Sequence, residues 1–164
     1  MPTIIELAQA IEDSAIGVSI AESTIAFPLL EGLHLLGLAL SFGLLTIADL
    51  RLLGVVLRKV PAAQVLQQLR IWVLAGFAIT FVTGGLLLWS EAGRMITNTA
   101  FIAKSVLMLL AIINASIFET RIAPRAIEWG EAVRVPNPAR VAAFTSLSLW
   151  LLVVLTGRLI PYLA

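Results

Sequence analysis

The only histidine of the chain follows a glutamate at helical spacing, in the segment Glu31-Gly-Leu-His34. Residues at positions i and i+3 of a helix lie on the same face, so this carboxylate and this imidazole can serve one site. Both lie in an apolar stretch, where an ionisable group is costly unless it is paired or hydrated. Such groups often mark functional sites in membrane proteins. We therefore expect the chemistry of this protein to centre on His34.

Residues from two other apolar segments are expected at a similar depth. At 1.5 Å per residue, His34 lies roughly 10 Å below the outer end of its segment, and Lys104 lies about 7 Å below the start of another. Arg158 precedes the end of the last segment by about one turn, and Met108 follows Lys104 by one turn. The predicted site comprises the following residues: Glu31, His34, Lys104, Met108 and Arg158.

The residue types favour haem over other chemistry. Carboxylate-bridged di-iron bundles need the Glu-x-x-His spacing from two helices, and this sequence has it once. The chain has no cysteine, which excludes thiolate metal sites. An imidazole on a membrane helix is a usual axial ligand of b-type haem. We predict haem b with His34 as the metal ligand and Lys104 or Met108 as the second ligand. Lys104 and Arg158 could pair with the two propionates, with Arg158 as the main propionate partner.

Other interpretations stay open at this point. Glu31 could form a structural ion pair with Lys104 or Arg158, and His34 could serve as a hydrogen-bonding contact between helices. A small proton, ion or solute transporter is the alternative function, and it predicts a hydrated route from His34 toward Asp49 through Gly37 and Ser41. An accessory membrane subunit without a cofactor is a further alternative.

The elements that position these residues are predicted to be membrane helices. Hydrophobic residues make up 60% of the chain and charged residues 13%, against roughly 25% charged in soluble domains. Mean hydropathy is +1.01. Apolar runs of about 18 or more residues indicate transmembrane spans. We expect an all-α, integral membrane four-helix bundle in one domain, residues 1–164, after a short amphipathic interfacial helix within residues 3–20. Its spans are 27–50, 71–89, 99–118 and 141–162.

The distribution of basic residues predicts the orientation in the membrane. Eight of the 11 lysines and arginines follow the first and third spans, and these are Arg51, Arg58, Lys59, Arg70, Arg121, Arg125, Arg134 and Arg140. Cytoplasmic loops carry such an excess. We therefore expect a multi-pass protein of the bacterial inner membrane with both termini periplasmic. The acidic N-terminus lacks the basic region of a signal peptide.

Charge and small residues also predict partners. The net charge of +1 and the lack of a basic run argue against nucleic acid as a binding partner. Small residues recur inside the spans and allow close helix packing, so we expect a homo-oligomer in the bilayer. A cofactor that carries electrons would also require a membrane redox partner.

Several short motifs resemble a known group of proteins. Glu31-Gly-Leu-His34-Leu-Leu-Gly37 is followed by Asp49-Leu-Arg51-Leu-Leu-Gly54, Asn98-x-x-Phe101-x-x-Lys104 and Gly157-Arg158. This order resembles a family of small, largely uncharacterised bacterial four-helix inner-membrane proteins. More distantly, the layout is similar to HemJ-type protoporphyrinogen oxidases and copper-resistance D-type membrane proteins. That resemblance implies a shared helical scaffold in which His34, Arg51 and Lys104 take the corresponding positions.

Overall fold

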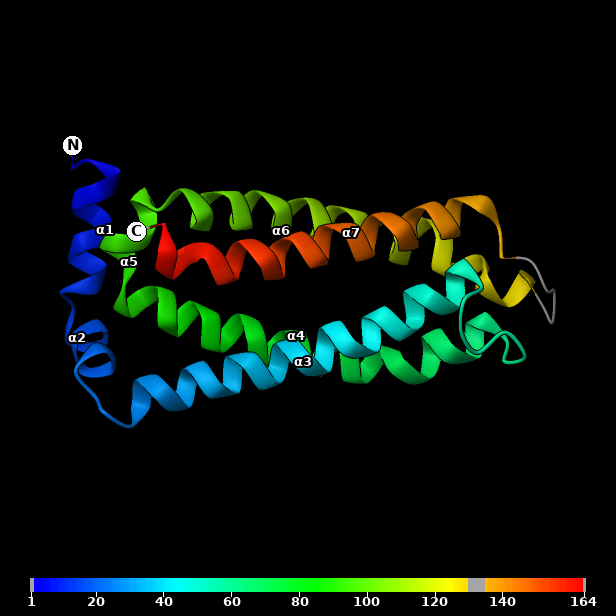
Figure 1. Ribbon diagram of the computed structural model, residues 1–164, viewed down its shortest axis with the longest axis horizontal. Coiled ribbons are helices and arrows are strands. Elements are labelled where there is room, and N and C mark those ends of the chain that lie inside the picture. Colours follow the sequence, from blue (N-terminus) through cyan, green and yellow to red (C-terminus); the bar gives the residue numbers. More distant parts are fainter. Residues whose placement is uncertain (1, 130–134, 164) are drawn as a thin grey trace.

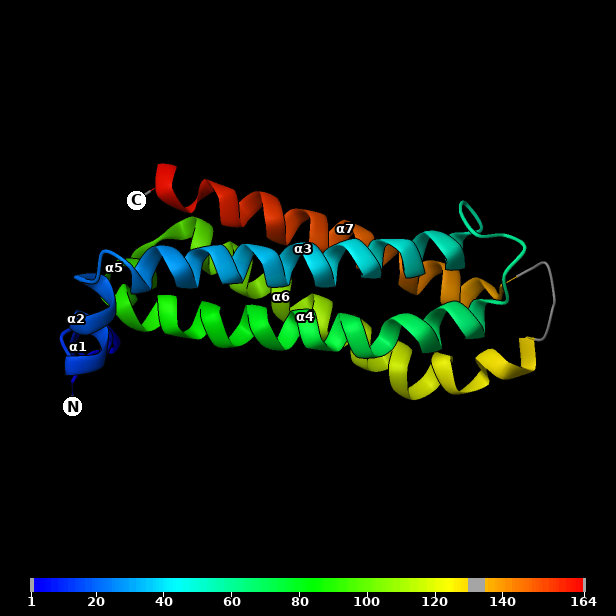
Figure 2. The same ribbon diagram turned by 90° about the horizontal axis from the view of Figure 1, so that it is seen from below.

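The computed structural model describes residues 2–129 and 135–163, and within them every regular element is helical. Four long helices form an elongated bundle (Figures 1 and 2). They are α3 (Ala26–Leu53), α4 (Ala62–Ser90), α6 (Thr99–Ile117) and α7 (Asn137–Leu159). Each is long and apolar enough to cross a membrane, counting the turns that extend α6 and α7. The predicted all-α class with four spans is confirmed.

The helix ends differ from the predicted spans. Helix α3 continues to Leu53 and stops because Gly54 adopts a left-handed φ of 77°, which glycine tolerates without strain. Helix α4 starts nine residues before the predicted span, at Ala62, directly after Pro61. The π-helical turn η1 (Phe118–Ile122) and the 3-10 helix η2 (Ala123–Trp129) extend α6. The additional turns are more polar than the spans, so hydropathy alone does not reveal them.

The N-terminal segment forms two short helices rather than the single helix expected within residues 3–20. Helices α1 (Ile4–Glu12) and α2 (Ala15–Ala21) are separated at Ser14, whose hydroxyl accepts the Gly17 N–H at 3.3 Å and caps α2. With α5 (Ala92–Thr97) they lie across one end of the bundle (Figure 1). Two hydrogen bonds attach them: Gly93 N–H to the Glu12 carboxylate at 2.7 Å, and Trp89 Nε1 to the Ser14 hydroxyl at 2.9 Å.

Helices α3 and α4 make backbone contact where two glycines face each other. A Cβ on Gly37 would lie 2.8 Å from Thr80 Oγ1 and 3.0 Å from the Gly76 carbonyl oxygen. A Cβ on Gly76 would lie 2.7 Å from the backbone nitrogen of Ser41. Small residues permit such an approach between membrane helices. This contact fixes the position of α4 relative to the face of α3 that carries His34.

The second hairpin, α6 with α7, is joined to the first mainly at the end where α3 finishes and α7 begins. There Leu52, Ala62, Ala139 and Ala143 form a buried cluster. A second cluster, nearer the middle, contains Trp150, whose ring centroid lies 4.7 Å from that of Phe77. Toward the end that carries α1, α2 and α5, helices α3 and α7 diverge (Figures 1 and 2).

Candidate functional site

His34 is half-buried between α3 and α4, and its ring lies against the backbone of Gly84. A Cβ on Gly84 would lie 2.8 Å from His34 Cε1 and 3.1 Å from Nδ1. Any larger residue at position 84 would therefore displace the ring or separate the helices. The imidazole reaches α4 because residue 84 has no side chain.

The hydrogen bonds of His34 determine its tautomer. Nδ1 lies 2.9 Å from the Thr80 carbonyl oxygen and 3.3 Å from Thr83 Oγ1. A carbonyl oxygen can only accept a hydrogen bond. The Thr83 hydroxyl donates its own hydrogen to the Ile79 carbonyl oxygen at 2.6 Å, so it too offers His34 a lone pair. Because both partners are acceptors, Nδ1 must carry the proton. In the neutral ring, Nε2 then keeps its lone pair free.

Lys104 brings a positive charge from the second hairpin toward His34. Lys104 is half-buried on α6. Its Nζ lies 3.6 Å from the position that a Cβ on Gly157 of α7 would take. The ammonium is close enough to the imidazole of His34 for an electrostatic interaction. The two ion pairs among residues 2–129 and 135–163 are Arg70–Glu119 and Arg94–Glu91. No described carboxylate therefore neutralises Lys104, and an ammonium in apolar surroundings favours an anionic neighbour.

The other predicted residues lie apart from this pair. Glu31 and Arg158 are exposed, and Met108 packs beside the cluster of Ala111, Trp150 and Val153. Glu31 forms no ion pair with Lys104 or Arg158 in the described structure, so that open alternative receives no support. Three residues turn an α-helix by about 300°, so Glu31 lies about 60° around the helix from His34. That difference is sufficient to direct Glu31 out of the bundle.

Metal-binding side chains do not cluster in the part of the chain that the structure describes. Groups of three or more His, Asp or Glu residues that could hold a metal ion are absent there. A metal bound at His34 would thus take its remaining ligands from a cofactor, from Lys104 or Met108, or from a second copy of the chain.

The route predicted for the transport alternative passes Gly37 and Ser41, where α3 packs closely against α4. Gly37 has no room for a Cβ, and Ser41 is fully buried with its hydroxyl bonded to the Gly37 carbonyl oxygen at 2.9 Å. The hydrated route itself stays a prediction. Beyond Ser41, Asp49 is 4% exposed, and its Oδ2 has no hydrogen-bond partner among the described residues.

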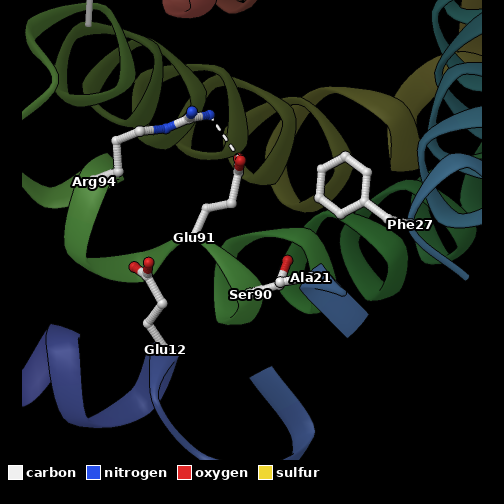
Figure 3. A pocket seen from close by; sticks show the side chains of 6 residues that line it. All are labelled: Glu12, Ala21, Phe27, Ser90, Glu91 and Arg94. Atoms are coloured by element: carbon white, nitrogen blue, oxygen red, sulfur yellow. Dashed lines mark hydrogen bonds and ion pairs between the residues drawn. The ribbon is translucent and has the colours of Figure 1, made fainter. Parts of the chain in front are cut away.

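A separate cavity of about 350 Å³ lies under the N-terminal helices (Figure 3). Arg94 lines it and donates to Glu91 at 2.7 Å, while the Glu12 carboxylate reaches it from α1. None of the residues predicted from the sequence lines this cavity. It belongs to the attachment of α1 and α2 to the bundle rather than to the His34 site.

Three residues that contact His34 had no predicted site role: Thr80, Thr83 and Gly84. These residues occupy positions i, i+3 and i+4 of α4 and thus form one polar, small-residue stripe on an otherwise apolar helix. That stripe was a usable signal in the sequence. Its pairing with His34 depends on the relative rotation and depth of two helices, which no local pattern specifies.

Adding a methyl group at Gly84 should disturb the site, whereas the same change at Gly85 should not. Gly84→Ala places a Cβ against the imidazole, and such overpacking costs about 1–3 kcal/mol. Gly85 has nothing within 4 Å of its Cβ position and provides the matched control. Thermal unfolding in detergent should show a lower midpoint for Gly84→Ala and an unchanged or slightly higher midpoint for Gly85→Ala. Equal midpoints would contradict the described contact.

Comparisons with known proteins identify one family. The model of a family of unknown function, DUF6644, matches residues 11–163. No curated protein and no solved structure matches the chain. The family match agrees with the expected uncharacterised group, while the distant resemblance to HemJ-type and copper-resistance D-type proteins receives no support.

Proposed function

The chain belongs to the DUF6644 family, and we propose that it binds a b-type haem or related porphyrin through His34 and takes part in membrane redox chemistry. One observation carries the proposal: the Nδ1 partners of His34 are both acceptors, which leaves the Nε2 lone pair free. Nitrogen in that state is the form that ligates iron.

The contacts around the imidazole suit a metal ligand. Ligating histidines usually donate their other ring N–H to a carboxylate, a carbonyl oxygen or water, which orients the ring and raises its basicity. The Thr80 carbonyl oxygen, 2.9 Å from Nδ1, occupies that role here. Gly84 allows the ring to rest against α4. His34 is thus held by contacts that leave Nε2 without a described hydrogen-bond partner.

Basic side chains complete the proposed site. Lys104 is half-buried without a described carboxylate partner, so it suits one propionate of a porphyrin. Lys104 and Met108 are the two candidates for a sixth ligand, and Arg158, exposed near the end of α7, is a candidate for the other propionate. Glu31 is exposed and receives no role as a ligand. A bound haem would supply one-electron transfer.

The proposal also includes the location of the protein in the membrane and its assembly. The basic residues after α3 and in the segment between α6 and α7 favour a cytoplasmic position for that end. The protein would then lie in a bacterial inner membrane with both termini periplasmic and His34 near the outer leaflet. One histidine per chain allows a second copy to contribute the other axial imidazole, so a homo-oligomer could hold one haem between two chains.

Visible spectra of the purified protein test this proposal. Protein expressed with added haem and purified in detergent should show a Soret band, and dithionite should sharpen the α and β bands. A pyridine haemochrome assay then gives the stoichiometry, where one haem per chain indicates a monomeric site and one per two chains a shared one. A protein that stays colourless under these conditions would contradict haem binding.

A small proton or ion transporter is the second candidate. It is favoured by Asp49, a buried carboxylate with one unpartnered oxygen, because ionisable residues within membrane helices often serve transport. Flux into proteoliposomes separates the two candidates. Proton or cation uptake by colourless protein, lost on Asp49→Asn, would favour transport over haem binding.

A further inference from the structure

A cavity of about 630 Å³ lies at the opposite end of the bundle from α1 and α2, between the end of α3 and the start of α7. It is far along the bundle from His34, so the inference below is independent of the proposed haem site. Ligand pockets commonly have volumes of roughly 300–1,000 Å³, which includes this one. Two arginines, Arg51 and Arg140, line it.

Arg51 is a buried cation that lacks an anionic partner within the described structure. It is 5% exposed, and its Nε donates to the Val60 carbonyl oxygen at 2.7 Å. Neither terminal nitrogen has a described hydrogen-bond acceptor, and no described carboxylate lies within ion-pair distance. Burial of an unpaired charge is expensive. The Val60 carbonyl oxygen accepts one of the five guanidinium N–H groups, and the residue lines the cavity.

Arg140 adds a second guanidinium from the first turn of α7. The start of a helix also favours anions through its dipole, but main-chain donors are few here. Pro138 has no N–H, and the N–H groups of Ala139 and Arg140 both bond to the Pro136 carbonyl oxygen. Asn137 supplies the remaining main-chain N–H of this turn. Binding of an anion in this cavity must therefore depend on the two guanidinium groups.

Two of the last carbonyl groups of α3 accept hydrogen bonds from the chain that follows the helix. Gly54 N–H bonds to the Arg51 carbonyl oxygen at 3.0 Å, and Val55 N–H bonds to that of Leu50 at 2.9 Å. These bonds satisfy the carbonyls of Leu50 and Arg51. Among the described residues that line the cavity, the two arginines are the only charged side chains. A planar guanidinium group matches the oxygens of a phosphate group.

We propose that this cavity binds a phosphate group through Arg51 and Arg140, supplied by an anionic phospholipid headgroup or by a small phosphate compound. This end of the bundle also carries the connection from α3 to α4, which contains Arg58, and the turn η1, which contains Arg121. Basic pockets between membrane helices on the cytoplasmic side are known to hold phospholipid headgroups.

Binding measurements on the full-length protein test the proposal. Native mass spectrometry in detergent would follow titration with phosphatidylglycerol and, separately, with phosphatidylcholine. The proteins compared are the wild type, Arg140→Gln, Arg51→Gln and the control Arg58→Gln. Arg58 is exposed and does not line the cavity. A second series would measure thermal shifts with inorganic phosphate and pyrophosphate in lipid-free micelles. Arg140 is exposed, so its replacement should not affect folding even if Arg51→Gln does.

We expect the affinity for the phosphate-containing ligand to fall about tenfold when either cavity arginine is replaced, because one charge-assisted contact is lost. The affinity should stay unchanged in Arg58→Gln. If the arginine variants lose affinity for phosphatidylglycerol alone, the ligand is a lipid headgroup. A loss in the phosphate and pyrophosphate series identifies a small phosphate compound. Raised salt should weaken either interaction. Equal behaviour of Arg140→Gln and Arg58→Gln in both series would overturn the proposal.

Discussion

Replacing His34 with alanine should remove haem from the purified protein completely, whereas the wild-type protein should bind it. The expected effect is large because His34 supplies the chain's only imidazole and its free Nε2 is the proposed axial ligand. Loss of a single metal–ligand bond normally cannot be replaced by packing contacts. The pyridine haemochrome assay and the Soret absorbance measure this result directly.

Two further measurements separate ligation from a structural role of His34. Added imidazole should enter the space left by His34→Ala and restore part of the haem spectrum. Thr83→Val removes a hydroxyl 3.3 Å from Nδ1 but leaves the bond to the Thr80 carbonyl oxygen, so it should retain haem. A His34→Ala protein with unchanged haem content would contradict the ligand assignment. If it lost haem only because it unfolded, added imidazole would not restore the spectrum.

Replacing Gly37 with valine should destabilise the bundle strongly, whereas Gly43→Val should have little effect. The new Cβ at position 37 would lie 2.9 Å from Ile79 Cγ2 and 3.0 Å from the Gly76 carbonyl oxygen. Neither a branched side chain nor a helix backbone can move aside cheaply. Overpacking commonly costs about 1–3 kcal/mol, and we expect about 3 kcal/mol or more here because valine would meet a branched side chain and a helix carbonyl oxygen at once.

Gly43 provides a control in the same helix. Its Cβ position has nothing within 4 Å, so valine there adds the same side chain and the same change in helix propensity without a collision. Unfolding of both variants in detergent, followed by circular dichroism, measures the difference. Similar midpoints would mean that α3 and α4 do not make backbone contact at Gly37 and Gly76.

The Gly37 variant should also affect the His34 site. Separation of α3 from α4 would lengthen the hydrogen bond between Nδ1 and the Thr80 carbonyl oxygen, because these atoms belong to the two helices that valine would push apart. We therefore expect weaker haem binding in Gly37→Val. Gly43→Val should bind haem as the wild-type protein does.

Local sequence properties determined the four membrane helices. Hydropathy and run length depend on neighbouring residues alone, and a bilayer requires each span to satisfy its own backbone hydrogen bonds. Spans near residues 27–50 and 99–118 could therefore be predicted closely. The ends were less accurate where polar turns continue a helix, as at Ala62–Arg70 and Phe118–Trp129.

The composition of the candidate site was only partly predictable. Depth along each span placed His34 and Lys104 at a similar level, and the structure places them within coulombic range. Depth could not show that Glu31 and Arg158 are exposed, since that depends on how each helix is rotated about its axis. Rotation is set by packing against partners that are distant in sequence.

Tertiary structure alone decided the protonation and the partners of the central residues. The Nδ1–H tautomer of His34 depends on Thr80 and Thr83 of another helix, which the close approach of α3 and α4 at Gly37, Gly76 and Gly84 brings into reach. Likewise, one cavity between the end of α3 and the start of α7 is lined by both Arg51 and Arg140. A sequence determines which segments enter the membrane, because each inserts by its own hydropathy. Which side chains then meet depends on the packing of all four helices together.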